Sequence, residues 1–166
     1  MTVWRWDILP NMLAYRITHK KYTDHLFAPG ISGRWNGAGK KVLYCAESIP
    51  VAFLESMLRR QGAGFNSDYQ IIVLEIPDNL AMLTIKVADL NDGWRNFRDY
   101  SICQYVGDAW FDSSETPILK VPSAVLVQCS NYVINTLHND FDKIKVKEIT
   151  ELMPDPRIDA LLKKYK

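Results

Sequence analysis

The sequence predicts one domain of the α+β class, spanning residues 1–166. A chain of this length buries roughly 70% of the surface that it exposes when unfolded, which is enough for one sizeable core. Segments with strand character outnumber those with helix character, and several strands follow one another without room for a crossover helix. The regular strand–helix alternation of a doubly wound sheet is therefore missing, and an α+β arrangement is favoured.

The strands are predicted from apolar runs and from alternation. Val42, Tyr44 and Ala46 share one face of a short strand. The run 70–76 is almost continuously apolar and is closed by a Pro-Asp pair, which is typical of a central strand buried on both faces. The predicted strands are 13–17, 42–46, 70–76, 83–87, 118–121, 124–128 and a half-exposed strand that holds Ile144, Val146 and Ile149.

Helices are predicted in three regions. The first has Ser48 as its N-cap, Pro50 in its first turn and two arginines at positions 59 and 60 at its end. Its apolar residues recur at helical spacing, and Glu55 falls at the edge of that apolar face. A helix in the middle region includes 101–110, and a short terminal helix begins at the Pro-Asp-Pro sequence 154–156.

Composition and missing motifs exclude several classes of function. The net charge of +1 gives no field that would attract nucleic acid or an anionic membrane. No apolar run approaches the ~20 residues of a membrane span, and residues 1–7 hold no apolar core of signal-peptide length, so we expect a cytoplasmic protein. The three cysteines form no Cys-x-x-Cys pair and are expected to be free thiols. No zinc motif, P-loop, Rossmann fingerprint or nucleophile elbow occurs, and we expect neither a metal nor a prosthetic group.

A few polar residues in apolar surroundings are the candidates for chemistry. Arg34 follows Gly33, where a guanidinium can bind two oxygens of a pyrophosphate or stack, exposed, on the next tryptophan. Tyr44 can stack on a flat ligand ring, or it can be a core tyrosine whose hydroxyl bonds the backbone. Glu55 can hold a ribose hydroxyl and stabilise positive charge on the sugar, or it can form an i,i+4 ion pair with Arg59.

Further candidates lie elsewhere along the chain. Ser123 separates two apolar segments, and its hydroxyl can donate to a ligand or be satisfied by a turn. Asn131 and Asn135 can fix loops around a pocket or form turns, and turns are the stronger local interpretation. Arg16 can be a second phosphate ligand or one half of a buried ion pair. No single one of these residues is specific, so the local alternatives stay open.

Several blocks in order give a stronger signal than any one residue. They are Tyr15-Arg16-Ile17, Gly33-Arg34-Trp35-Asn36, 42–48, Ala52-Phe53-Leu54-Glu55, Gly107-Asp108-Ala109-Trp110, 119–124, 131–135 with His138, and 155–158. With these blocks the chain resembles the RES domain family, which is named after Arg, Glu and Ser and forms the toxin half of bacterial RES–Xre toxin–antitoxin pairs. The chain departs from the family pattern at Ser32, where a glycine is more usual, at Thr136, where a proline is more usual, and in the tail after Arg157.

The resemblance implies a fold and a set of partners. The expected fold is like that of NAD-using ADP-ribosyltransferases, with a split, mostly antiparallel β-sheet, flanking helices and a cleft for NAD. NAD is the expected substrate. The expected partner is an Xre-type helix-turn-helix antitoxin, which blocks the cleft and itself binds DNA, so no direct nucleic-acid binding by this chain is expected. A homodimer within the antitoxin complex is compatible with this arrangement.

The resemblance also implies a mechanism. We expect a type II toxin that depletes NAD by cleaving the nicotinamide–ribose bond, through hydrolysis or phosphorolysis. The alternatives are transfer of ADP-ribose to a protein and, in a different class, a non-catalytic nucleotide-binding or interaction module. Glu55 would stabilise the oxocarbenium-like sugar, Arg34 would hold the pyrophosphate and Tyr44 would stack near the nicotinamide ring. The substrate-binding residues would be Ser123, Arg16 and Asn131.

Overall fold

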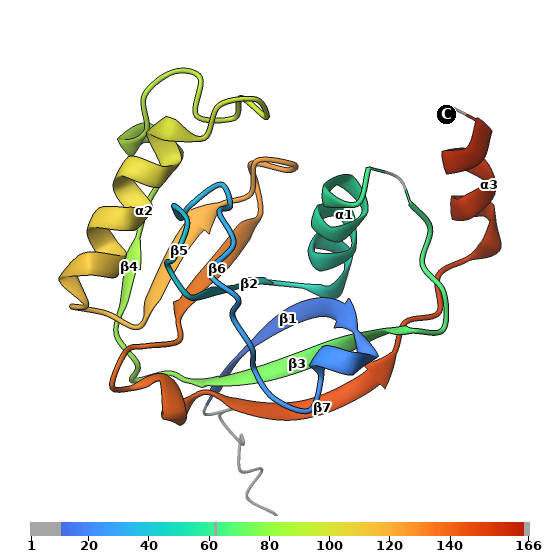
Figure 1. The fold of residues 1–166 in the computed structure, drawn as a ribbon, viewed down its shortest axis with the longest axis horizontal. Coiled ribbons are helices and arrows are strands. Elements are labelled where there is room, and N and C mark those ends of the chain that lie inside the picture. The colour runs from blue at the N-terminus through green and yellow to red at the C-terminus, as the bar shows by residue number, and fades with distance from the viewer. Residues whose placement is uncertain (1–10, 62, 165–166) are drawn as a thin grey trace, which may run out of the picture.

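The computed structural model describes residues 11–61 and 63–164, which form a seven-stranded sheet with helices packed on it (Figure 1). Residues 1–7, on which the expectation about a signal peptide rests, lie outside the described residues, and the single-domain boundary at 1–166 stays a prediction. The strands, in the sheet order β4-β5-β6-β2-β1-β3-β7, are all antiparallel to their neighbours except β4 and β5. Their bounds are β1 Asn11–His19, β2 Val42–Ala46, β3 Tyr69–Pro77, β4 Met82–Thr84, β5 Ile118–Pro122, β6 Ser130–Asn135 and β7 Lys145–Glu151.

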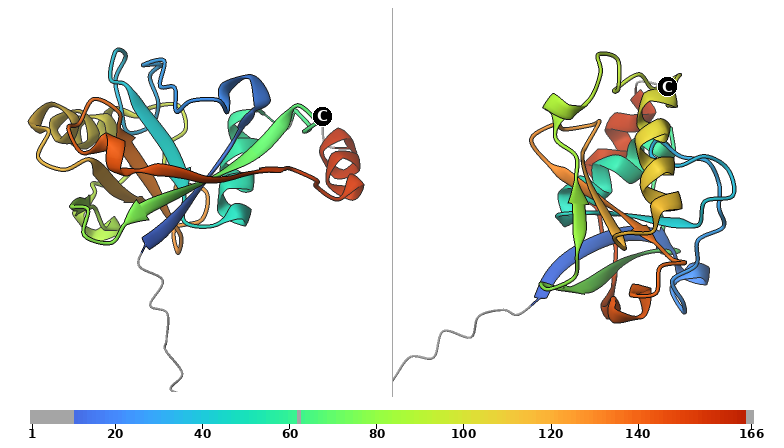
Figure 2. Two further views of the ribbon diagram at one scale, coloured as in Figure 1. Left: turned by 90° about the horizontal axis from the view of Figure 1, so that it is seen from below. Right: turned by 90° about the vertical axis from the view of Figure 1, so that its left-hand side faces the viewer.

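The sheet is split between β1 and β2. These two strands pair only where Tyr15 lies opposite Ala46, whereas β1 pairs with β3 along its whole length and β2 pairs with β6 along its whole length. In the left view of Figure 2, β7 runs nearly horizontally while β2 and β6 run steeply, so the two halves of the sheet are turned relative to each other. The predicted α+β class and the split, mostly antiparallel sheet are confirmed.

The α-helices are α1 Ile49–Arg59, α2 Ser101–Ser113 and α3 Pro156–Lys164, and all three predicted regions are confirmed. Ser48 caps α1, because its side chain accepts a hydrogen bond from the Val51 amide, and a proline occupies the first turn. The helix α1 packs through Val51 and its neighbours on the half of the sheet that holds β1 and β3. The helix α2 packs through Cys103 and Trp110 on the half that holds β5 and β6.

The strand β3 has the two-sided burial that its apolar run predicts. Ile72 and Leu74 belong to the core on one face, and Ile71 and Val73 belong to the core under α1 on the other. The strand lies between β1 and the mostly exposed β7, so it is interior to the sheet although it is next to an edge strand. The strand expected near Ile149 is β7, which confirms its existence, but it begins after Ile144 and is more exposed than predicted, with six of its seven residues exposed.

Two strand predictions were wrong because local hydrogen bonds turn the chain. The predicted strand 83–87 ends early: β4 stops at Thr84, and the chain then enters a 3-10 helix at Val87–Asp89, where the Lys86 amide donates to the Asp89 carboxylate. The segment 124–128 is a loop. The hydroxyl of Ser123 accepts hydrogen bonds from the amides of residues 125 and 126, which draws those amides away from strand pairing.

A third expectation was wrong at β6. The turn favoured for Asn131 does not form, because Asn131 lies within β6, which pairs with β2 and β5. Asn135 is the last residue of β6 and does form a turn, since its Oδ1 accepts from the Leu137 amide at 2.9 Å and its carbonyl accepts from the His138 amide at 3.3 Å. Asn135 is almost completely buried at the end of this strand. Asparagine is rare in strands, so local propensity opposed the pairing that the tertiary structure imposes.

Candidate active site

The carboxylate of Glu55 is the centre of a hydrogen-bonded group drawn from three distant segments. Its Oε1 accepts a bond from Ser123 Oγ at 2.8 Å and one from Asn131 Nδ2 at 2.5 Å. Glu55 is half-buried on α1, and no residue in the described part of the chain bonds its Oε2. In the described structure, Glu55 and Arg59 do not form the ion pair that their i,i+4 spacing allows. Glu55 therefore has one oxygen fixed by the protein and one left for a ligand.

The hydroxyl of Ser123 is oriented by the loop that follows it. Ser123 is completely buried directly after β5, and its Oγ accepts from the Val125 amide at 3.2 Å and from the Leu126 amide at 3.1 Å. With both acceptor positions occupied, the hydroxyl hydrogen is free to point at Glu55. The geometry gives Ser123 a role in holding the carboxylate of Glu55.

Asn131 holds Glu55 from the neighbouring strand. It lies opposite Val121 on β5, close to Ser123 in the sheet. Its amide nitrogen donates to Glu55, and its Oδ1 is buried without a hydrogen-bond partner among the residues described. A buried acceptor without a donor is costly, so this atom is a candidate to receive a hydrogen bond from a ligand after a small movement.

Arg34 lies on a tight turn and is held by a second loop. Its Nη1 donates to the carbonyl of Trp94 at 2.7 Å and to that of Asn96 at 3.2 Å, and its guanidinium stacks over the ring of Tyr100 at 4.6 Å from the centroid. The tryptophan next to Arg34 is buried and is not its stacking partner. No carboxylate within the described ranges pairs with Arg34, so its positive charge is not neutralised by the protein.

Tyr44 fixes the turn of Arg34 through its hydroxyl. The Tyr44 Oη accepts from the Trp35 amide at 2.9 Å and donates to Asn36 Oδ1 at 2.6 Å. Burial raises the pKa of the Tyr44 hydroxyl well above its usual range. A Cβ at Gly33 would lie 2.8 Å from the Tyr44 hydroxyl, which explains why a glycine precedes Arg34. The hydroxyl is thus used inside the protein, and the ring, which is only partly buried, is the part left to meet a ligand.

Arg16 lies at the split of the sheet. Its Nη1 donates to the carbonyl of Tyr44 at 3.0 Å, which links β1 to β2 beyond their one backbone pair. Burial lowers the pKa of the Arg16 guanidinium, with a smaller contribution from the like charge of Arg59. The ion pair considered for Arg16 is not formed by any residue that the structure describes. A partly buried cation without an acidic partner is suited to bind an anion.

The six predicted residues form two groups that share a connecting loop. Glu55, Ser123 and Asn131 form one group, and Arg16, Arg34 and Tyr44 form the other. The loop 94–96 connects the two groups, because Arg95 Nε donates to the carbonyl of Ala124 at 3.0 Å, beside Ser123, while Arg34 bonds the residues on either side of Arg95. Two surface hollows, one along α2 and one between α1 and residues 152–158, are lined by none of the six.

Three residues that support the turn of Arg34 received no role from the sequence, although two of them, Asn36 and Asp108, lie in the blocks 33–36 and 107–110. Asn36 is completely buried, and its Nδ2 donates to the carbonyls of Ile31 and Gly37. Gln104 and Asp108 on α2 bond the same turn from the other side. The predicted helix that includes 101–110 and the block 107–110 pointed to α2, but neither pointed to Gln104 as a support of the turn. In the described residues, no group of three or more His, Cys, Asp or Glu side chains is placed to hold a metal ion.

Comparison with known proteins decides the family. The RES domain matches residues 13–158. The chain belongs to the RES domain family. The protein named Prs ADP-ribosylating toxin from Sphingobium sp. (strain YBL2) is 30% identical over 164 residues, which cover 95% of this chain and 98% of that relative. A protein named Toxin Res from Pseudomonas putida is 28% identical and covers 89% of this chain and 99% of the relative.

Solved structures agree on the fold of this RES domain. It is similar to a chain in the crystal structure of the M. tuberculosis MbcT–MbcA toxin–antitoxin complex, with a TM-score of 0.70 and 22% identity over 93% of this chain and 88% of that chain. Its relatives in the family are named as toxins, and it groups with the RES domain toxins. None of the helices in the described residues has the length and the apolar character needed to cross a membrane.

Proposed function

We propose that this RES domain chain is a toxin that breaks the bond between nicotinamide and ribose in NAD and passes the ADP-ribose to water or phosphate. The observation that carries the proposal is the carboxylate of Glu55, which Ser123 and Asn131 hold by one oxygen while its other oxygen has no partner among the described residues. A carboxylate fixed in advance stabilises positive charge without reorganising during the reaction.

Cleavage of the nicotinamide–ribose bond requires few other protein groups. When the C–N bond breaks, its electron pair leaves with nicotinamide, which becomes neutral and needs no general acid. The ribose carbon becomes oxocarbenium-like, as in glycoside hydrolysis, and the oxygen of water or phosphate then bonds to it and gives up a proton to the solvent. In this scheme the free Oε2 of Glu55 faces the sugar, and Ser123 and Asn131 keep the carboxylate in place.

The arginines supply the binding of the diphosphate. Arg34 and Arg16 have no acidic partner in the parts of the chain that are described, and a guanidinium binds phosphate oxygens with paired hydrogen bonds. Tyr44 connects the two, because its carbonyl accepts from Arg16 and its hydroxyl holds the turn of Arg34. Its ring is the proposed stacking surface for nicotinamide.

A second function has its own support. The relative with 30% identity carries the name Prs ADP-ribosylating toxin, and by that name it ADP-ribosylates Prs. The same Glu55 group would serve a transferase, because the sugar cation forms in the same way and only the nucleophile differs. Transfer of ADP-ribose to a protein is therefore the alternative for this chain, with Prs as the first acceptor to try.

The proposed partner is an antitoxin. The structural neighbour was solved with its antitoxin, and this supports an antitoxin for the present chain as well. We propose an Xre-type helix-turn-helix protein that covers the site in the cytoplasm, with a homodimer of the toxin within that complex.

The deciding experiment measures NAD and its products with purified protein. Wild type is incubated with NAD, with or without phosphate, and nicotinamide and the ADP-ribose product are quantified beside the Glu55→Gln variant. Nicotinamide release by wild type, and a fall of about 10²–10³ in rate for Glu55→Gln, are expected. NAD bound but not consumed would support a non-catalytic module instead. Labelled NAD added to a lysate, or to purified Prs, separates the transferase, since only a transferase labels protein bands.

A further inference from the structure

The helix α2 fixes the turn that carries Arg34, and we propose that Gln104 and Asp108 are positioning residues for the Arg34 guanidinium in NAD binding. This inference rests on the proposed function, which gives Arg34 its role toward the diphosphate. Neither residue is bonded to Arg34 itself. Both act on the backbone of the turn Gly33–Gly37, from which the Arg34 side chain extends.

Gln104 bonds both ends of the turn. Its Nε2 lies 2.9 Å from the carbonyl oxygen of Gly33, 3.2 Å from that of Asn36 and 2.9 Å from Ser32 Oγ. The Gly33 amide also donates to the Asn36 carbonyl at 2.9 Å, which closes the turn. One side-chain amide therefore supplies donors to the residues that flank Arg34, and Ser32, which departs from the family pattern, takes part.

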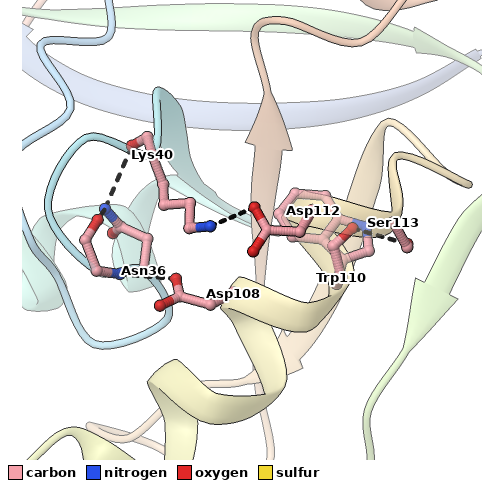
Figure 3. A network of polar contacts seen from close by, with 7 residues as sticks. Asn36, Lys40, Asp108, Trp110, Asp112 and Ser113 are labelled. Carbon is pink, nitrogen blue, oxygen red and sulfur yellow. Dashed lines mark hydrogen bonds and ion pairs between the residues drawn. The ribbon is translucent and has the colours of Figure 1, made fainter.

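Asp108 lies one helical turn after Gln104 and therefore on the same face of α2. Its Oδ1 accepts a hydrogen bond from the Gly37 amide at 2.8 Å. Figure 3 shows the Asp108 carboxylate pointing from α2 toward the loop that carries Asn36 and Lys40. A charge-assisted bond to a backbone amide is a strong anchor, so Asp108 fixes the end of the turn.

Gly107 brings the helix and the turn into direct backbone contact. A Cβ at this position would lie 1.8 Å from the carbonyl oxygen of Trp35, so no other residue fits without moving the turn or the helix. A glycine inside a helix is less favourable than an alanine, so it has a cost in stability. The close approach gives that cost a reason, and it brings the side chains of Gln104 and Asp108 within hydrogen-bond distance of the turn.

The opposite side of the turn is held by the sheet. Tyr44 bonds the Trp35 amide, and Asn36 is buried beneath the turn. The turn is thus fixed from both sides. The Arg34 guanidinium also bonds the carbonyls of Trp94 and Asn96, but the turn sets where its side chain starts. Losing the α2 side therefore displaces Arg34, while Glu55, on α1, keeps its own partners.

The experiment compares KM and kcat for NAD in Gln104→Leu, Asp108→Ala and Asp108→Asn. The first two are expected to raise KM about tenfold and to leave kcat within about twofold, because Arg34 binds the diphosphate in the ground state and the transition state alike. Asp108→Asn keeps an oxygen for the Gly37 amide and is expected to restore KM to near the wild-type value. Asp112→Asn is the matched control, since Asp112 lies one turn later on α2 and, within the part of the chain that the structure describes, pairs with the Lys40 ammonium and not with the backbone of the turn.

A double variant tests the route through Arg34. If Asp108 acts through Arg34, then Arg34→Ala with Asp108→Ala should raise KM no more than Arg34→Ala alone. Additive losses would overturn the proposal. So would a fall in kcat without a change in KM, or an Asp108→Ala variant that matches Asp112→Asn.

Hydrogen exchange of residues 32–40 keeps the test independent of activity. The amide of Gly37 should exchange faster in Asp108→Ala than in wild type, and it should be unchanged in Asp112→Asn. Equal exchange in all three proteins would refute the anchoring by α2, even with a normal NAD assay. A wild type that consumes no NAD at all would refute the proposed function, and faster exchange in Asp108→Ala would then still establish the anchor.

Discussion

The half-buried carboxylate of Glu55 accepts a hydrogen bond at 2.8 Å from the completely buried hydroxyl of Ser123, 68 residues later in the chain. The amides of Val125 and Leu126 donate to the oxygen of Ser123, so its hydrogen is available to bond Glu55. This pair ties α1, on one half of the split sheet, to the end of β5 on the other half. It is the link on which the proposed chemistry depends.

Replacing Ser123 by alanine should therefore lower kcat with little change in KM. A hydrogen bond to a charged group contributes about 1.5–3 kcal/mol, which corresponds to a fall in rate of about tenfold to a hundredfold if the bond serves the transition state. The measurement is steady-state NAD consumption, with thermal unfolding as a check of the fold. Ser67→Ala, on an exposed loop, is the control, and an unchanged kcat for Ser123→Ala would contradict the role given to this hydroxyl.

Replacing Asn131 by aspartate should be more harmful than replacing it by alanine. The new carboxylate oxygen would occupy the place of Nδ2, 2.5 Å from Glu55 Oε1, and two carboxylates so close cannot both be ionised. The pair would hold a proton to higher pH, so activity at neutral pH should fall and should recover as the pH rises. A pH–rate profile checks this, and a profile like that of Asn131→Ala would count against the geometry.

Two substitutions of Tyr44 separate its hydroxyl from its ring. Tyr44→Phe keeps the ring but leaves the Trp35 amide and the Asn36 side chain without their partner, which costs about 1–3 kcal/mol for each buried group left unpaired. We expect a lower melting temperature and a higher KM for NAD. Tyr44→Leu should in addition lower kcat if the ring stacks on nicotinamide. A Phe variant with wild-type stability would show that the hydroxyl does not anchor the turn.

The stability of the protein should fall at alkaline pH through Cys45. Burial raises the pKa of the Cys45 thiol from 9.0 to about 11, and the nearby Arg16 charge opposes this only in part. The folded state then keeps a proton that the unfolded state releases. The contribution of the buried thiol to the free energy of unfolding is therefore complete below pH 9 and is lost as the pH rises to about 11. The loss is on the order of 2–3 kcal/mol.

Urea unfolding at pH 8 and at pH 10.5 measures this effect. The drop in unfolding free energy between the two pH values should be smaller in Cys45→Ala than in wild type, whatever the variant costs in packing. Tyr44, whose pKa burial also raises, contributes to the drop above pH 10 in both proteins, so some loss remains. An equal drop in both proteins would mean that the thiol of Cys45 is not what titrates.

Local patterns in the sequence were sufficient where neighbours along the chain decide the structure. The strand 42–46 and the helix that starts after Ser48 have the predicted bounds, because alternation and capping are local. Prediction was wrong where distant partners decide. Asn131 was expected in a turn and lies on β6 because β2 and β5 pair with it from both sides. The prediction at 124–128 was wrong for a local reason instead: the segment is apolar enough for a strand, but the hydroxyl of the neighbouring Ser123 accepts from the amides of Val125 and Leu126.

The candidate site also has features that follow from the sequence and features that depend on the tertiary structure. The sequence by itself determined which residue types are present and, through the order of the blocks, the family of the chain. Only the tertiary structure decided that Glu55 bonds Ser123 and Asn131, that the hydroxyl of Tyr44 holds a turn, and that Gln104 and Asp108 support Arg34. Hydrogen bonds between residues so far apart depend on how strands pair and how helices pack, and local propensity carries no information about that pairing.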